Sequence, residues 1–457
     1  MMRISCPDNN RSEREYIIRY IFEGLLKVPA EIVFEPGIDR YVIQVDDSHS
    51  IIVEDHFFNR FPEDLAYCRK ENIPVRLSMF HFEGEAIPML YGLDSVEVGP
   101  DRIRVGLDIF ASAFFMLSRW EEYVLGRESF IYDYRHPQLY QVDEDALFCV
   151  RNGIAERPLV HEYEFLIRRL MTILGQALPF DRKALLLITH DVDYLGCRPV
   201  GMVYGQVSKS LKKGALSKAW KVLAFHVKSR WFSMKRKNAF SMYVQKATEY
   251  GYHGVFLFKA CKKQDAGYSY DLSGLHARRV IRSLKKAGAS FGFHPSENVY
   301  RRDDSFKKEY DRLRSATGSA PVLGRNHRLL HNSQSLRQWK TASVSQISNW
   351  GFQQRVGFRC GICLPFPVFN VLARELAGVS DVPFVLMDSS LKREFKTASN
   401  ADAQQKRMIR DLVDTVARLG GVLCVNWHVN PFTEKGFREG YRYYSFLLEE
   451  ASKKHLA

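Results

Sequence analysis

The first third of the chain alternates short runs of apolar and polar residues with turn residues. Runs in which β-branched residues recur at every second position predict strands, and they fall at 41–45, 50–53, 73–77 and 102–105. A helix is predicted from Asp108 to Tyr123, because its apolar residues are spaced to form one buried face. A polar, irregular segment at 133–157 is typical of a linker. These elements predict a smaller N-terminal α+β domain with its linker over residues 1–150.

The apolar runs that follow are continuous rather than alternating. Such runs suit strands that are buried on both faces of a parallel sheet, and they lie at 183–189, 254–258, 289–293, 384–387 and 421–427. Helices are predicted between them at 272–287 and 400–419, and a helix at 160–178 leads into this region. Strands that alternate with helices predict an α/β domain over residues 160–457, either a barrel or an open sheet.

Composition narrows the class of protein. The 457 residues are 46% hydrophobic and 26% charged, which excludes disordered, collagen-like and coiled-coil proteins. No apolar run approaches the roughly 18 residues that a membrane span needs, and the N-terminal residues lack the apolar core of a signal peptide. We therefore expect a cytoplasmic protein. The only C-x-x-C pair, Cys360 and Cys363, is expected to be two packed thiols.

The net charge of +14 is concentrated in one segment. From Tyr194 to Thr248 the chain has twelve lysines and arginines and no acidic residue, with aromatic residues interleaved. A basic helical insertion is therefore expected at about 198–246. It fits a solvated amphipathic hairpin, or an element that binds an acidic membrane surface or a lipid phosphate. Nucleic acid ranks last as a partner, because no nucleic-acid-binding motif accompanies the charge.

Polar residues stand at the ends of the apolar strands in the second domain. Asp191 and Asp193 end the first strand, His294 follows another, and His428 follows the last. The carboxyl ends of barrel strands build the active site, and two aspartates two positions apart share one side of an extended strand. An isolated Asp-x-Asp is more often a cap, and a lone histidine more often a core residue. Three such elements at strand ends favour a divalent metal site and metal-assisted hydrolysis.

The order of these motifs from Lys183 to Phe432 resembles the polysaccharide deacetylase family. The segments that carry the resemblance are 189–193, 294–298, 325–327, 348–361 and 426–428. The resemblance implies an irregular (β/α) barrel and a metal-dependent deacetylase. It is closest to a bacterial subgroup with a distinct N-terminal domain, which the sequence up to Glu122 resembles.

The resemblance also implies a role for each residue of the site. Asp191 would act as general base and His428 as general acid. Arg359 would either orient Asp191 or form a structural salt bridge. Arg325 and Trp427 are expected to bind substrate. The expected ligands of a divalent metal, zinc first and cobalt or nickel as alternatives, are Asp193, His294, Asn298 and His327.

The sequence departs from the family pattern in three places. Val192 separates Asp191 from Asp193, which leaves the base and ligand roles open to exchange. Asn298 stands where the family has a second histidine, so that His327 is an alternative third ligand. The fourth motif lacks its aspartate at 347–350, and Asp388 is either a substitute for it or a helix cap.

The leading hypothesis is a metal-dependent hydrolase that removes an N-acetyl group from a carbohydrate or glycan precursor, lipid- or nucleotide-linked. Such an enzyme would be cytoplasmic, with residues 198–246 holding it at the inner membrane surface or on a substrate phosphate. The alternative is a catalytically degenerate carbohydrate-binding protein of the same fold. A nucleic-acid-associated protein is the third hypothesis, which leaves the acidic and histidine cluster unexplained.

Overall fold

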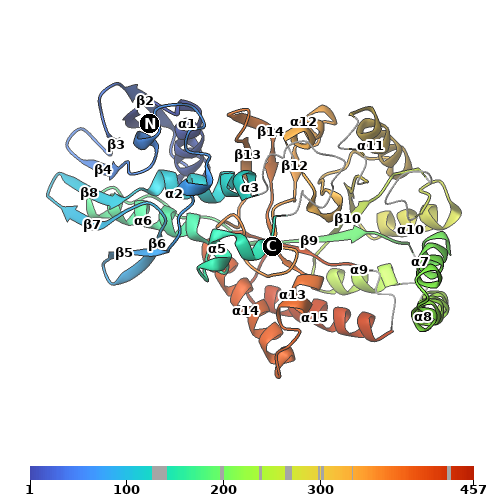
Figure 1. Ribbon diagram of the computed structural model, residues 1–457. Coiled ribbons are helices and arrows are strands. Elements are labelled where there is room, and N and C mark those ends of the chain that lie inside the picture. The colour runs from blue at the N-terminus through green and yellow to red at the C-terminus, as the bar shows by residue number, and fades with distance from the viewer. Residues whose placement is uncertain are drawn as a thin grey trace.

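The N-terminal part of the protein is built on a six-stranded mixed sheet (Figure 1). The computed structural model describes residues 1–125, 142–195, 200–235, 239–262, 270–296, 299, 303–331, 333–429 and 434–457. The strand order is β2-β1-β3-β4-β8-β7. The bounds are β1 Met2–Pro7, β2 Ala30–Glu35, β3 Arg40–Gln44, β4 Ser50–Glu54, β7 Gly92–Val98 and β8 Arg102–Leu107. A separate hairpin pairs β5 (Ser78–Phe82) with β6 (Glu85–Met89).

Three of the four strands predicted in this part are present as β3, β4 and β8. The prediction at 73–77 is wrong, because this run belongs to no strand and β5 begins only at Ser78. Pro74 lies in that run and has no backbone N–H to give to a ladder.

The helix predicted from Asp108 to Tyr123 is two helices. α2 (Ile109–Ser118) ends where Arg119 adopts a left-handed conformation with φ 51°, and α3 (Trp120–Leu125) follows. The Asp108 side chain caps α2 by accepting a hydrogen bond from the Ala111 N–H. All ten residues of α2 are buried, because the helix packs against α1 (Arg11–Arg19), α6 (Leu159–Ile173) and β13 (Phe366–Asn370).

The predicted linker is structured where it is described. Residues 144–151 form a 3-10 turn, Glu144–Ala146, and a short helix α5, Phe148–Arg151. Glu144, Phe148 and Cys149 are buried, so this segment packs in the protein instead of crossing solvent.

The C-terminal part is α/β, as predicted, with parallel strands in the order β11-β10-β9-β16-β15 (Figure 1). The continuous apolar runs form β9 Leu185–Val192, β10 Gly254–Phe258, β11 Ser290–Phe293, β15 Phe384–Met387 and β16 Val422–Asn426. A three-stranded sheet, β12-β14-β13, stands beside them, with β12 Gln346–Ile347 and β14 Glu375–Asp381. The helices are α7 Val200–Lys212, α8 Leu216–Lys235, α9 Ala239–Glu249, α10 Leu275–Lys286, α11 Asp303–Thr317, α12 Ser333–Thr341, α13 Asp388–Glu394, α14 Ala401–Leu419 and α15 Glu434–Lys453.

Two features join these sheets into a curved layer. Gly324 makes parallel bridges to Phe293 on one side and Ile347 on the other. Only Val382 and Pro383 separate β14, which pairs with β12, from β15, which pairs with β16. Buried apolar side chains of these strands and the segments beside them form one cluster: Val255, Leu257, Leu323, Val382, Phe384, Met387, Val422 and Cys424. The ladders among the described strands do not make a closed barrel.

The two parts meet along strand β13, which is the edge of its sheet. The hydroxyl of Tyr16 donates to the Pro367 carbonyl at 2.9 Å, and that of Tyr20 donates to the Pro365 carbonyl at 3.1 Å. The Tyr16 ring also stacks on Phe369, with 4.9 Å between ring centroids. The N-terminal helices therefore cover this edge.

Cys360 and Cys363 are fully buried free thiols, as predicted. Burial raises the pKa of each to about 12, so neither is a ready thiolate. Among the described helices, none combines the length and apolarity that crossing a bilayer requires.

Candidate active site

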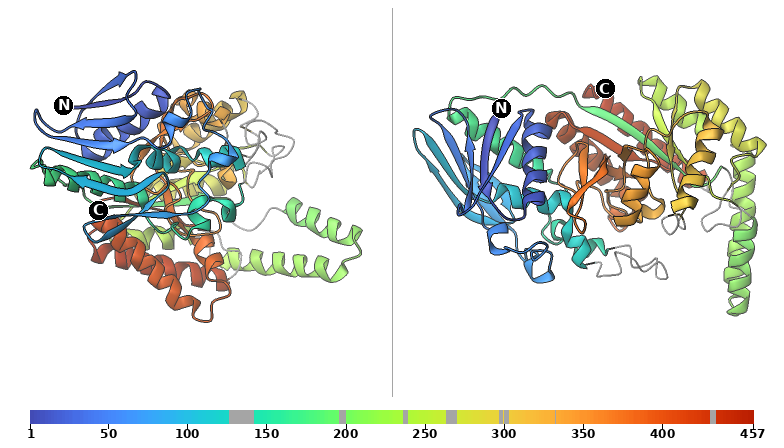
Figure 2. Two further views of the ribbon diagram at one scale, coloured as in Figure 1. Left: turned by 60° about the vertical axis from the view of Figure 1, so that its left-hand side comes forward. Right: turned by 90° about the horizontal axis from the view of Figure 1, so that it is seen from above.

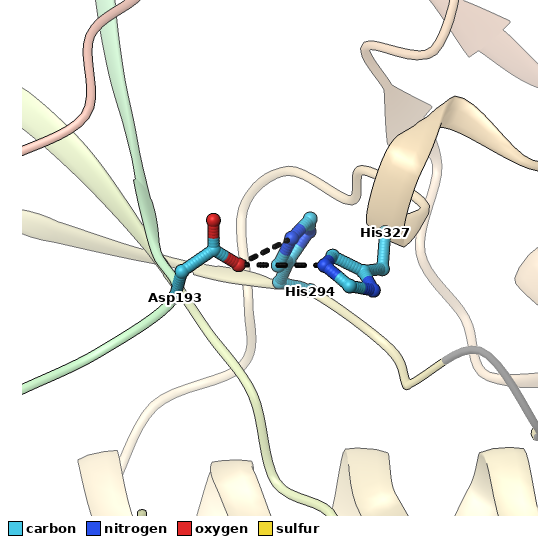
Figure 3. A group of neighbouring side chains, drawn as sticks. All are labelled: Asp193, His294 and His327. Atoms are coloured by element: carbon cyan, nitrogen blue, oxygen red, sulfur yellow. Dashed lines mark ion pairs between the residues drawn. The ribbon is translucent and has the colours of Figure 1, made fainter. Parts of the chain in front are cut away.

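Three potential metal ligands converge beyond the carboxyl ends of the strands (Figure 3). Asp193 follows β9, His294 follows β11, and His327 comes three residues after the bridging Gly324. Their ligand atoms lie within 4.8 Å of one another. The Asp193 Oδ1 atom is 3.7 Å from the His294 Nε2 atom and 3.5 Å from the His327 Nε2 atom. The strand ends thus bring together three of the four predicted ligands.

The backbone fixes the tautomer of His294. Its Nδ1 atom lies 2.7 Å from the carbonyl oxygen of Arg325, which can only accept, so the proton is on Nδ1. Nε2 is then the ring atom that faces Asp193, and it is the one that would bind a metal. A backbone carbonyl that orients a histidine in this way is the usual outer support of a metal ligand.

Lys259 occupies part of the same cluster. This buried lysine follows β10, and its Nζ atom lies 2.7 Å from Asp193 Oδ1 and 3.0 Å from His327 Nε2. Burial would raise the pKa of Asp193, but the neighbouring His294 imidazole and the charges of Lys259 and His428 hold it well below its usual value. The sequence analysis missed Lys259, although its place directly after an apolar strand was a usable signal.

The donor set fits a divalent metal on one condition. One carboxylate and two imidazoles are the ligands that catalytic zinc and related ions prefer. The Lys259 ammonium, however, touches two of these three donors. A metal and this ammonium compete for the same atoms, so Lys259 has to turn away when a metal binds.

Asp191 is a buried carboxylate beside this cluster, with both oxygens held. Arg325 Nη1 donates to Oδ1, and Asn426 Nδ2 donates to Oδ2, each at 2.9 Å. Burial raises the pKa of Asp191, but the charges of Arg325, His294 and His428 outweigh it and bring the pKa to about 2. Asp191 is therefore ionised at every working pH.

Arg325 takes the place that was predicted for Arg359. The prediction that Arg359 pairs with Asp191 is wrong: its Nε atom is 3.0 Å from Glu122 Oε1, and its Nη1 atom donates to the Gly351 carbonyl at 3.0 Å. Helix α3 brings Glu122 to Arg359, and this contact spans 237 positions of the chain.

The two residues expected to bind substrate are buried. Arg325 is 0% exposed and donates to Ser348, Thr189 and Asp191, so it holds other side chains in place. Trp427 is 1% exposed and packs on the Tyr444 ring, with 5.6 Å between centroids. Neither presents a surface to a sugar, which corrects the expectation for both.

His428 faces the cluster from the end of β16. Its Nε2 atom is 3.9 Å from Asp193 Oδ2, and its Nδ1 atom is 2.7 Å from Asp388 Oδ1. Burial alone would lower the pKa of His428, but Asp388, followed by Asp191 and Asp193, raises it to about 10. The imidazole is therefore protonated at neutral pH. Of the two roles left open for Asp388, the geometry favours the one at the site.

The fourth motif lacks an acidic residue but still supports the site through Ser348. The Ser348 hydroxyl accepts from Arg325 Nη2, and the Ser348 carbonyl accepts from Arg325 Nε, both at 2.8 Å. This segment thus fixes the arginine that holds Asp191. Asn298, the remaining predicted ligand, lies outside the described residues.

One family model matches the N-terminal part of the chain. Residues 2–176 match a family of unknown function, DUF7033, and this match ends just after α6. No curated protein matches the chain.

Solved structures that resemble the chain include a probable polysaccharide deacetylase, a carbohydrate esterase and an allantoinase. A protein from Pseudomonas aeruginosa PAO1, described as a probable polysaccharide deacetylase, has 12% identity and a TM-score of 0.38, covering 62% of this chain and 96% of its own. A family 4 carbohydrate esterase from Streptomyces lividans has 11% identity and a TM-score of 0.28, with 48% and 84% covered. The Puue allantoinase has 11% identity and a TM-score of 0.37, with 58% and 84% covered. Scores of this size do not establish a common fold.

Proposed function

We propose that this protein is a metal-dependent hydrolase that removes an N-acetyl group from a carbohydrate or glycan intermediate. Its C-terminal domain would be an irregular, incompletely closed (β/α) barrel of the polysaccharide deacetylase type. The observation that carries the proposal is one cluster of side chains. Asp193, His294 and His327 could hold a metal, with the Asp191 carboxylate two positions before Asp193 and the protonated His428 3.9 Å from Asp193 Oδ2.

The residues divide the chemistry of amide hydrolysis between them. A metal bound by Asp193, His294 and His327, zinc first and cobalt or nickel as alternatives, would supply Lewis acidity toward the acetyl carbonyl and acidify a water molecule. Asp191, fixed by Arg325 and Asn426, would accept the proton of that water. Because its pKa is about 2, Asp191 is a weak base and depends on that acidification.

His428 would donate a proton to the leaving amine. Its Nδ1–H is held by Asp388, which points Nε2 toward the cluster. A general acid with a pKa above neutrality stays charged until the amine departs. Removing either the acid or the base is expected to cost roughly two to four decades in rate.

Acetate release tests the proposal directly. Metal-stripped protein is supplied with zinc, cobalt or nickel and with N-acetylated sugars that are free, nucleotide-linked or lipid-linked. We expect metal-dependent release that Asp191→Asn and His428→Gln both abolish. Asp47→Asn, the same change at an exposed aspartate of the N-terminal part, serves as the control. Release that persists without metal, or in Asp191→Asn, would contradict the proposed mechanism.

Lys259 supports a second candidate, a carbohydrate-binding protein that has lost turnover. An ammonium bound to Asp193 and His327 could replace the metal as the cation of a binding site. Absence of acetate release across the substrate panel from folded protein supplied with metal, together with saturable binding of the same sugars, would favour this candidate.

A further inference from the structure

The basic insertion is a helical hairpin that projects from the body of the protein (Figure 2). Helices α7 and α8 run beside each other and are joined by a tight turn, in which Gly214 has φ 68°. Helix α7 begins seven residues after Asp193, so the hairpin follows the site residues at the end of β9 closely in the sequence. Its side chains are described for residues 203–227.

An apolar stripe runs along the outside of α8. Leu216, Trp220, Leu223 and Val227 follow one another at steps of four, three and four, which places them in one line on a helix. Their exposed fractions are 65%, 70%, 42% and 60%. The adjoining face, which includes Ala219 at 5% exposure, is turned inward. Described parts of this chain therefore leave the stripe uncovered.

Positive charge accompanies the stripe without any negative charge. Five lysines of the hairpin are exposed: Lys209, Lys212, Lys213, Lys218 and Lys221. Lys212 and Lys213 lie at the tip of the hairpin. They stand between Leu211, which is 48% exposed, and Leu216, the first residue of the stripe. The tip thus combines apolar side chains with ammonium groups.

We propose that this hairpin docks on a bilayer that contains acidic lipids. Tryptophan and aliphatic side chains insert at the level of the headgroups, and lysines bind the lipid phosphates through stems long enough to reach them. A second copy of the chain is disfavoured as the occupant, because two acid-free hairpins would bring like charges together. Nucleic acid would pair its phosphates with the lysines but would leave the leucine and valine side chains exposed to water.

Vesicle sedimentation tests the proposal with the full chain. The probes are phosphatidylcholine vesicles with and without 30% phosphatidylglycerol, at low and at high salt. We expect binding only with the acidic lipid, weakened by salt. Since each basic residue near an acidic surface contributes roughly fivefold in affinity, Lys212→Gln with Lys213→Gln should lose at least about tenfold.

Matched variants distinguish binding through the stripe from non-specific hydrophobic binding. Trp220→Ser with Leu223→Ser should abolish sedimentation, whereas Leu275→Ser, which changes a side chain 73% exposed on α10, should leave it unchanged. Lys285→Gln with Lys286→Gln, exposed on the same helix, is the charge control. Circular dichroism establishes that each variant is folded.

Three results would overturn the proposal. The first is absence of binding to acidic vesicles by folded wild-type protein. The second is self-association that the stripe variant abolishes, which would assign the stripe to a second copy. The third is tighter binding to a 30-nucleotide DNA than to vesicles, unaffected by the stripe variant. Each readout is independent of acetate release, so failure here leaves the proposed hydrolase untouched.

Discussion

Replacing Lys259 by methionine should strengthen metal binding. The methionine side chain has nearly the same length and keeps the packing, but it removes the ammonium that contacts Asp193 and His327. A hydrogen bond to a charged group contributes about 1.5–3 kcal/mol. Because about 1.4 kcal/mol corresponds to tenfold in an equilibrium constant, a metal that no longer displaces the ammonium should bind about 10- to 100-fold more tightly.

A competition titration measures this effect. Stripped protein and a chromophoric chelator compete for zinc at constant pH, for the wild type, Lys259→Met, and Lys286→Met as the exposed-lysine control. The control should match the wild type, and His294→Ala should lose affinity. Zinc should also raise the melting temperature of Lys259→Met more than that of the wild type, since the variant leaves Asp193 without its cation. Equal or weaker zinc binding by folded Lys259→Met would refute the competition.

Three other changes test the surroundings of the site. Arg325→Met leaves the buried Asp191 charge without its partner and should lower the free energy of unfolding by about 3–5 kcal/mol at neutral pH. Because the Asp191 pKa of about 2 lies below its usual value, this difference between variant and wild type should shrink in urea titrations as the pH falls. Asp388→Asn removes the main charge that raises the His428 pKa to about 10, so NMR titration of metal-free protein should show a lower His428 pKa. An unchanged pKa would show that Asp388 does not control the protonation of His428. Gly324→Ala would place a Cβ 2.2 Å from a buried tryptophan ring and should destabilise by about 1–3 kcal/mol in thermal melts, unlike an alanine at the open helical Gly205.

The sequence predicts the central strands well, because burial on both faces leaves a pattern that few other structures share. β9, β10, β11, β15 and β16 all coincide with continuous apolar runs. The missed strand β13 contains Pro367, and Pro365 precedes it, so its pattern looks like that of a loop. Strand β14 was missed because polar residues and a glycine interrupt it.

The candidate site is predictable only in part. Strand ends locate Asp193, His294 and His428, since parallel strands deliver their carboxyl ends to one edge. Which arginine meets Asp191 depends on packing across 134 positions, and no local pattern encodes that choice between Arg325 and Arg359. The position of Lys259 over two ligands is likewise a result of tertiary geometry.

Two tyrosine hydroxyls, which donate to the Pro367 carbonyl of β13 and to the Pro365 carbonyl just before it, limit how this protein can be divided. An uncovered sheet edge presents unpaired backbone groups that recruit strands from other chains. Tyr16 and Tyr20, which come from the N-terminal part, shield this edge. Residues 160–457 expressed alone would expose this edge and should aggregate, so the N-terminal part would also prevent self-association through β13.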